Sequence, residues 1–169
     1  ILKGMITIII DYYKRGLMKE IFNIIIPVLI QVESGGNVNA IGDGGKAVGC
    51  LQIHRIMVDD VNRIAEMQGW WDVHNFYNYD EFTLDDRYSK DKSIQMCEYY
   101  LEYYYQKYVK WWNEQCSKPL YHPMPFDVCE VLARLWNGGY AGLKRNPRAT
   151  DNYWEKVKKE LAQKRMGEI

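Results

Sequence analysis

A strongly apolar segment that ends on an acid constrains the fold more than any other part of the sequence. Between Lys19 and Val32, apolar residues occupy positions nearly all round a helix, which is typical of a helix buried in a protein core. Because Pro27 interrupts this segment, we expect a kink or the start of a new segment there. Glu33 follows directly, and the glycine-rich residues 35–49 cannot continue as helix. The sequence therefore predicts a buried helix with a carboxyl group at its C-terminal end.

The rest of the chain predicts a mainly α domain with one small β element. "GDGG" at residues 42–45 can form the tight turn of a β-hairpin. Helical spacing recurs over four further segments: residues 54–67, about Ser93 (a candidate N-cap) to Trp112, 126–137 (ended by Gly138 and Gly139), and roughly 151–164. We expect residues 1–17 to be an N-terminal extension that is either not native or poorly ordered. Residues 18–169 then form a single domain.

Composition and charge exclude several classes of protein. The 22 basic and 22 acidic residues cancel, which argues against a general nucleic-acid binder. The N-terminal apolar run lacks a small-residue cleavage site and is too short to span a membrane, so we expect no signal peptide and no stable membrane anchor.

His54 and His74 are poorly accompanied by acids, so we expect no metal and place these side chains in surface or capping roles. We expect free, mostly buried thiols at the cysteines, which show no metal-ligand spacing: Cys50, Cys97, Cys116 and Cys129.

The position of Glu33 favours a protonated carboxyl group. An acid at the C-terminal end of a helix faces the negative end of the helix dipole, and apolar neighbours remove water from it. Glycosidic bond cleavage needs such a group, because the leaving oxygen must be protonated as the bond breaks. Glu33 is therefore a candidate general acid, although the same position also fits an acid that simply ends a helix in water.

Three segments resemble, in order, the motifs of the soluble lytic transglycosylase and goose-type lysozyme superfamily. "VESGGNVNAIGDGGKAVGCLQI" (32–53) is similar to its Glu-Ser helix end followed by Gly-x-x-Gln-Ile. "ARLWNGGYAG" (133–142) is similar to its Ala-x-Tyr-Asn-Ala-Gly segment, and "ATDNYWEKV" (149–157) to its Glu-Thr-Arg-Asn-Tyr segment. The resemblance covers residues 28–157. It implies a lysozyme-like fold, in which a helical domain and a small β-hairpin or loop lobe flank the catalytic cleft.

The resemblance also implies roles for single residues. Glu33 would act first as acid and then as base, with Ser34 supporting the site beside it. Gln52 would hydrogen-bond the sugar or the intermediate, and Asn137 would hold acyl or hydroxyl groups of the substrate. Tyr153 would help to fix Glu33.

Aromatic residues near the implied cleft are candidate sugar-binding side chains. Trp136 stands where the family usually has Tyr, so it can stack on a sugar ring but lacks the phenol hydroxyl. Tyr140, Trp70 and Trp71 lie nearest the implied cleft in motif order. The tyrosine-rich segment 99–112 has helical spacing and is expected in the core and on its flank.

Asp43 leaves two mechanisms open. A carboxylate on this loop could hold a water molecule for an inverting hydrolase if it lies roughly 6.5–9.5 Å from Glu33. Asp43 could equally serve only the "GDGG" turn. Glu33 would then act alone, and the 6-hydroxyl of the sugar would attack to give an anhydro product, as the transglycosylase resemblance implies.

We therefore expect a peptidoglycan-cleaving muramidase that acts on the β-1,4 bond between N-acetylmuramic acid (MurNAc) and N-acetylglucosamine (GlcNAc). We expect a lytic transglycosylase that needs no cofactor, binds glycan strands as a monomer and does not bind nucleic acid. The alternatives are a hydrolytic lysozyme or chitosanase-like glycosidase that uses Glu33 and Asp43, and a non-catalytic domain that binds cell walls or builds a virion. A third alternative is that a basic C-terminal helix docks on a membrane or on nucleic acid. The family and the missing signal peptide suit a bacteriophage lysin, held in the host cytoplasm before its release to the cell wall or carried in the virion.

Overall fold

The computed structural model describes residues 2–68, 81–115 and 124–167. These residues are mainly helical and include one two-stranded antiparallel sheet, so the prediction of a mainly α chain with a small β element is confirmed. In chain order the elements are α1 (Leu2–Ser34), β1 (Ile41–Gly42), η1 (Asp43–Gly45), β2 (Ala47–Val48), α2 (Arg55–Met67), η2 (Asp85–Tyr88), α3 (Lys90–Gln115), α4 (Val128–Arg145), η3 (Pro147–Thr150) and α5 (Asp151–Gly167). Trp70, Trp71, His74 and Cys116 lie outside the described residues.

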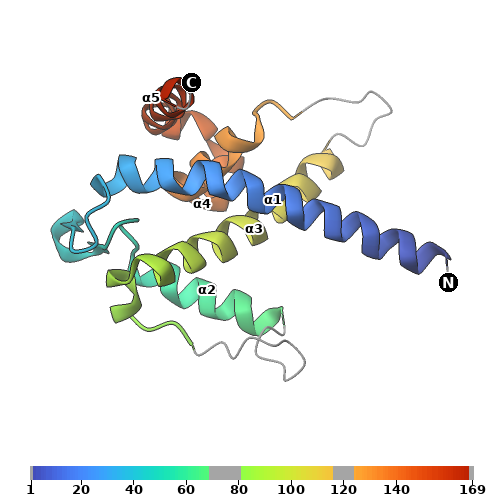
Figure 1. Cartoon of the computed structure of the whole chain (residues 1–169), viewed down its shortest axis with the longest axis horizontal. Coiled ribbons are helices and arrows are strands. Elements are labelled where there is room, and N and C mark those ends of the chain that lie inside the picture. The colour runs from blue at the N-terminus through green and yellow to red at the C-terminus, as the bar shows by residue number, and fades with distance from the viewer. Residues whose placement is uncertain (1, 69–80, 116–123, 168–169) are drawn as a thin grey trace.

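Helix α1 runs through Pro27, so no new segment begins there, and the alternative, a kink at this residue, stays a prediction (Figure 1). Proline removes one helical hydrogen bond and crowds the preceding turn. Its ring is exposed here, while Ile26 and Val28 on either side are buried in the core. Tertiary packing on both sides of the proline therefore holds the helix together. The expected boundary after residue 17 falls inside this helix, and the division into extension and domain stays a prediction.

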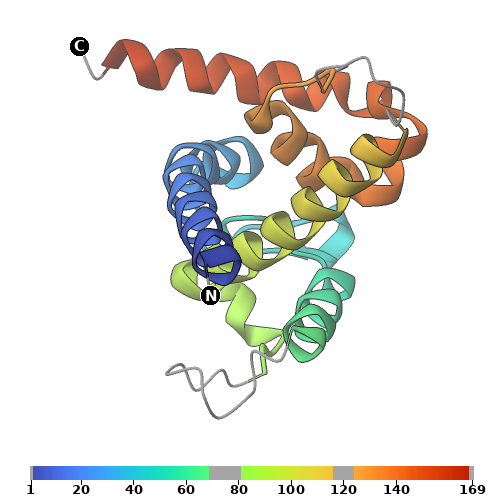
Figure 2. The same cartoon turned by 90° about the vertical axis from the view of Figure 1, so that its right-hand side faces the viewer.

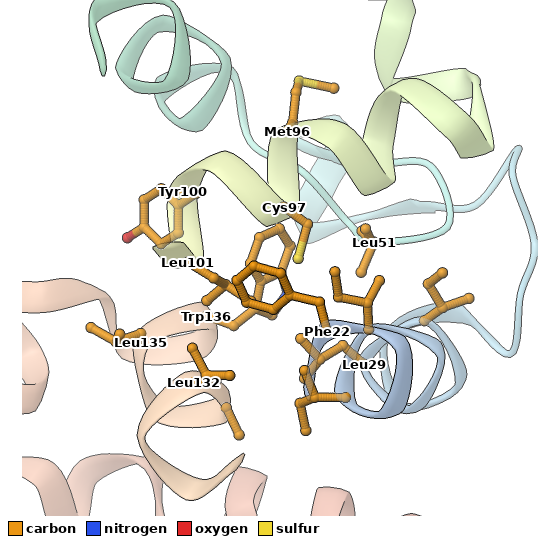
Figure 3. Close-up of a cluster of buried hydrophobic side chains, with 14 of the residues drawn as sticks. Phe22, Leu29, Leu51, Met96, Cys97, Tyr100, Leu101, Leu132, Leu135 and Trp136 are labelled. Carbon is orange, nitrogen blue, oxygen red and sulfur yellow. The ribbon is translucent and has the colours of Figure 1, made fainter. Parts of the chain in front are cut away.

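The core lies where α1, α3 and α4 meet, and Figure 3 shows their side chains converging. Leu29 of α1 has no exposed surface, which confirms the predicted burial of this helix. Leu101 of α3, Leu132 of α4 and Leu51 from the loop after β2 are also fully buried in this cluster. Helix α2 packs against α3, and α5 packs across α1 and α4 (Figure 2).

One predicted helix end differs in the structure, and another is present. Helix α3 begins at Lys90, and Ser93 is a buried residue inside it whose hydroxyl donates to the carbonyl oxygen of Arg87 at 3.0 Å. Ser93 is therefore not the N-cap. Within the range of α4, Gly139 has a non-helical backbone (φ 67°, ψ 170°), so two helical segments meet there at a kink. This interruption at a glycine, which can adopt a positive φ, agrees with the helix end expected at Gly138 and Gly139.

Residues 41–53 form a small lobe directly after the C-terminal end of α1 (Figure 1). Ile41 pairs with Val48 across the two strands. Gly49 has a φ of +81°, and a Cβ atom there would lie 1.8 Å from the carbonyl oxygen of Arg87 in η2. The Arg87 guanidinium donates back to the carbonyl oxygen of Ile53 at 3.3 Å. Close backbone contact and this hydrogen bond together fix the lobe against η2.

Candidate functional site

Glu33 lies in the last turn of α1, where it contacts a residue from the other end of the chain. The hydroxyl of Tyr153 in α5 donates a hydrogen bond to Oε1 of Glu33 at 2.7 Å, across 120 residues of sequence. Burial, followed by the negative charge of Glu33, raises the pKa of Tyr153, so this hydroxyl keeps its proton and remains a donor. The predicted contact between Tyr153 and Glu33 is therefore present in the structure.

The surroundings of Glu33 favour its protonated form. Burial raises the pKa of this carboxyl group above its ordinary value. Hydrogen bonding from Tyr153 and from the Trp136 indole opposes this effect, as do the more distant positive charges of Lys156 and His54. Burial is the largest of these effects. The direction of the pKa shift agrees with the sequence argument, and removal from water is its main cause.

A buried arginine holds the start of α5 and thereby places Tyr153. Arg134 of α4 forms ion pairs with Asp151 at 2.8 Å and with Glu130 at 2.7 Å, and it donates to the hydroxyl of Thr150 at 3.0 Å. Asp151 stands only two residues before Tyr153 at the first turn of α5. Sequence reasoning missed Arg134, because nothing in the sequence around it distinguishes a buried arginine from a solvated one.

Trp136 is buried beside the site. Its side chain is only 7% exposed and packs edge-on against the ring of Tyr100 at 6.0 Å between ring centroids. Figure 3 shows it within the hydrophobic cluster. Its indole lies near enough to Glu33 to lower the pKa of that carboxyl group. The predicted stacking of Trp136 on a sugar stays a prediction.

Ser34 and Gln52 connect Glu33 to the lobe. The hydroxyl of Ser34 donates to the carbonyl oxygen of Cys50 at 2.8 Å and accepts from the amide of Gly36 at 3.2 Å. Gln52 has a φ of +50°, and its side-chain amide donates to the carbonyl oxygen of Gly49 at 2.9 Å. In this structure Gln52 thus holds the loop, and its expected bond to a sugar stays a prediction. Both residues fix the backbone that follows the acid.

Asp43 stands in the turn between the two strands, as the simpler reading of "GDGG" predicts. Its side chain is 61% exposed, and its φ of +47° lies in the left-handed region. The carboxylate lies 3.7 Å from Nε2 of His54, which directly precedes α2. Since His54 also acts on the pKa of Glu33, this histidine is electrostatically linked to both acids.

Asn137 and Tyr140 follow Trp136 on α4 and are more accessible than it. Asn137 is exposed, so it can meet a ligand. Tyr140 is half-buried and stacks on Tyr104 of α3 at 5.7 Å between ring centroids. The roles of Asn137 and Tyr140 toward a substrate stay predictions.

A surface pocket of about 500 Å³ opens beside this group of aromatic rings. Within it, Asp60 accepts a hydrogen bond from the hydroxyl of Tyr104 at 2.7 Å and pairs with Arg63 at 2.6 Å. Tyr100 lines the pocket and contacts Trp136, whose indole lies near Glu33. This pocket was not predicted from the sequence, because its parts come from separate helices. Its lining residues are Ile56, Met57, Asp59, Asp60, Arg63 and Tyr100.

The described part of the chain offers neither a metal site nor a membrane span. No group of three or more His, Cys, Asp or Glu side chains there could hold a metal ion. Among the same residues, no helix has the length and hydropathy needed to cross a membrane. Cys50 and Cys97 are free, buried thiols, as predicted.

Comparison with known proteins adds no relative to this description. No protein-family model, no curated protein and no solved structure matches the chain significantly. The geometry around Glu33 and the motif resemblance are therefore the grounds for proposing a function.

Proposed function

We propose that this domain cleaves the β-1,4 bond between MurNAc and GlcNAc in peptidoglycan, with Glu33 as the catalytic acid and base. The observation that carries the proposal is the 2.7 Å hydrogen bond from Tyr153 to a carboxyl group whose pKa is raised by burial. The two residues belong to the first and third of the motif-like segments, and the indole of Trp136 in the second lies near Glu33. This meeting of the segments supports a lysozyme-like site of the transglycosylase type.

The geometry supports a proton cycle on Glu33. Protonated Glu33 donates its proton to the leaving oxygen as the glycosidic bond breaks, and the carboxylate that remains accepts a hydrogen bond from Tyr153. The carboxylate then takes the proton of the hydroxyl group that attacks the sugar, which restores the acid. Such proton transfers contribute about 10²- to 10⁴-fold to the rate. Binding and distortion of the sugar supply the rest.

The attacking hydroxyl group distinguishes two candidate activities. We favour attack by the 6-hydroxyl of the sugar, because Asp43 is exposed and engaged with His54 in a turn. A hydrolase that uses Asp43 to hold water is the second candidate, supported by the link of His54 to both acids and by the positive φ of Asp43. The burial of Trp136 in the core argues against the non-catalytic alternative, in which this ring would block the cleft.

The test is to incubate wild type and Glu33→Gln with purified peptidoglycan and to identify the released fragments by mass spectrometry. Glu98→Gln is the matched control, because Glu98 is another half-buried glutamate whose pKa is raised by burial, on α3. We expect release by wild type and Glu98→Gln and almost none by Glu33→Gln.

The products separate the two activities, and the variant tests the role of Glu33. Anhydro-muramyl ends identify a transglycosylase, and reducing ends identify a hydrolase. If Glu33→Gln kept more than about a tenth of the wild-type rate, the role assigned to Glu33 would be wrong, since loss of the acid alone should cost more than that.

A further inference from the structure

Two lysines and three aromatic rings form a cluster where α3 and α4 meet. We call this set, Lys107, Lys144, Tyr104, Tyr140 and Trp111, the lysine–aromatic cluster. The ammonium groups of Lys107 and Lys144 lie 5.1 Å and 5.0 Å from the centroid of the Tyr140 ring. Lys144 also lies 4.8 Å from the centroid of Trp111. The rings attract both cations and hold each of them beside Tyr140.

The positive charge of this cluster is not neutralised within the described residues. Neither Lys107 nor Lys144 forms an ion pair with an acid in that part of the chain. Asp60, which bonds Tyr104 of the cluster, is already paired with Arg63 at 2.6 Å. Because both positive charges lie beside one ring, an anion bound next to that ring would be attracted by both.

A series of ring contacts links the cluster to the candidate active site. The ring of Tyr104 lies 4.7 Å from that of Tyr100. Tyr100 contacts Trp136 at 6.0 Å between ring centroids, and the Trp136 indole lies near Glu33. The rings of Tyr100 and Trp136 therefore separate the cluster from Glu33.

We propose that the lysine–aromatic cluster binds a carboxylate of the peptide that MurNAc carries, while the glycan lies at Glu33. This inference rests on the proposed function and adds recognition of the peptide to it. The sugars of the strand are uncharged once the lactyl group is joined to the peptide, so the anionic groups of the substrate lie on the peptide. A peptide of four or five residues extends roughly 15 Å, which allows an anion to reach beyond the sugar that carries it. With two ammonium groups and Tyr104 beside it, Tyr140 is better placed to bind an anion than to stack on a sugar ring.

The first test compares cleavage of two substrates by a charge variant. Lys107→Met/Lys144→Met removes both charges and keeps side chains of similar length, and Lys110→Met/Lys159→Met removes the same charge from exposed positions of α3 and α5. The substrates are peptidoglycan free of teichoic acid and the same strands after an amidase has removed the peptides. The lactyl carboxyl groups that the amidase frees are coupled to methylamine, so that the bare strands stay uncharged. We expect kcat/KM of the cluster variant to fall about tenfold on the peptide-bearing strands and to stay within about twofold on the bare strands. The control variant should match wild type on both.

The second test measures binding without turnover. Calorimetry with a free, carboxylate-bearing stem peptide should show binding to Glu33→Gln that weakens with salt and is about tenfold weaker when the cluster charges are also removed. Equal binding with and without these charges, no peptide binding at all, or an equal loss of rate on both strands would overturn the inference. Cell walls that retain teichoic acid serve as a phosphate-bearing comparison. If the cluster variant lost activity only on these walls, the cluster would bind phosphate, and the inference would be overturned. If wild type cleaves neither strand, the proposed function fails, and the calorimetry still decides whether the cluster binds the peptide.

Discussion

Replacing Tyr153 by Phe removes a single oxygen atom from the site and tests how Glu33 is tuned. The hydroxyl donates to Oε1 of Glu33 at 2.7 Å and favours the carboxylate, so it lowers the pKa of Glu33 against the larger effect of burial. The phenyl ring of the variant still fills the space between α5 and α1. The pKa of Glu33 should therefore rise further in Tyr153→Phe, because burial acts with less opposition.

The size of the effect follows from the strength of the lost bond. A hydrogen bond to a charged group contributes about 1.5–3 kcal/mol, and about 1.4 kcal/mol corresponds to a tenfold change in ionisation. Glu33 is half-buried, so we take the lower end of this range. The proposed reaction starts from protonated Glu33, and its rate falls as pH rises through the pKa of this group. In Tyr153→Phe this fall should move to a pH higher by about one.

The measurement is kcat/KM for soluble glycan fragments from about pH 4 to about pH 9. Tyr105→Phe is the control, since Tyr105 is half-buried on α3 and its pKa is raised by burial alone. We expect the control to keep the wild-type profile. A falling limb in Tyr153→Phe that stays in place or moves to lower pH would show that this hydroxyl does not act on the catalytic acid.

Two further predictions concern stability, measured by urea unfolding. Burial raises the folded-state pKa of Glu33 above its ordinary value of 4.5, so wild type loses stability as pH rises from there through the folded-state pKa. Glu33→Gln does not titrate, and its stability relative to wild type should increase over this range; a constant difference would contradict the assigned pKa direction. Gly49→Ala should cost about 3 kcal/mol or more, because its Cβ would meet the carbonyl oxygen of Arg87 and its φ is positive. Gly44→Ala, with a positive φ but open space around it, should cost about 1 kcal/mol, and equal costs would refute the packing argument.

Local signals predicted the helices of this chain better than their ends. The apolar residues around Leu29 indicated a buried helix, and "GDGG" indicated the turn between β1 and β2, because both depend on neighbours in sequence. Gly139 interrupts its helix as its local preference predicts, whereas no new segment begins at Pro27. Ile26 and Val28, on either side of Pro27, are buried in the core. Tertiary packing overrides local preference at such a position.

The candidate site likewise combines features that the local sequence predicts with features that depend on tertiary packing. The position of Glu33 at the end of an apolar helix was sufficient to predict the direction of its pKa shift. The contact with Tyr153 was expected only from the motif resemblance, since 120 residues separate the partners. Arg134, and the pocket with Asp60, could not have been predicted, because their side chains act through partners on other elements. The burial of Trp136 likewise depends on how α3 packs against α4.

The type of donor around Glu33 bears on whether this acid could work in catalysis. Within the described residues no arginine or lysine forms an ion pair with Glu33; Lys156 acts on it only electrostatically. An ion pair would lower the pKa of the carboxyl group and keep it ionised, so it could not donate a proton near neutral pH. The hydrogen-bonding partner is instead the phenol hydroxyl of Tyr153, which stabilises the anion once it forms without carrying a charge. A carboxyl group held in this way can give up a proton and take it back, whereas a glutamate that only ended a helix would need neither burial nor this donor.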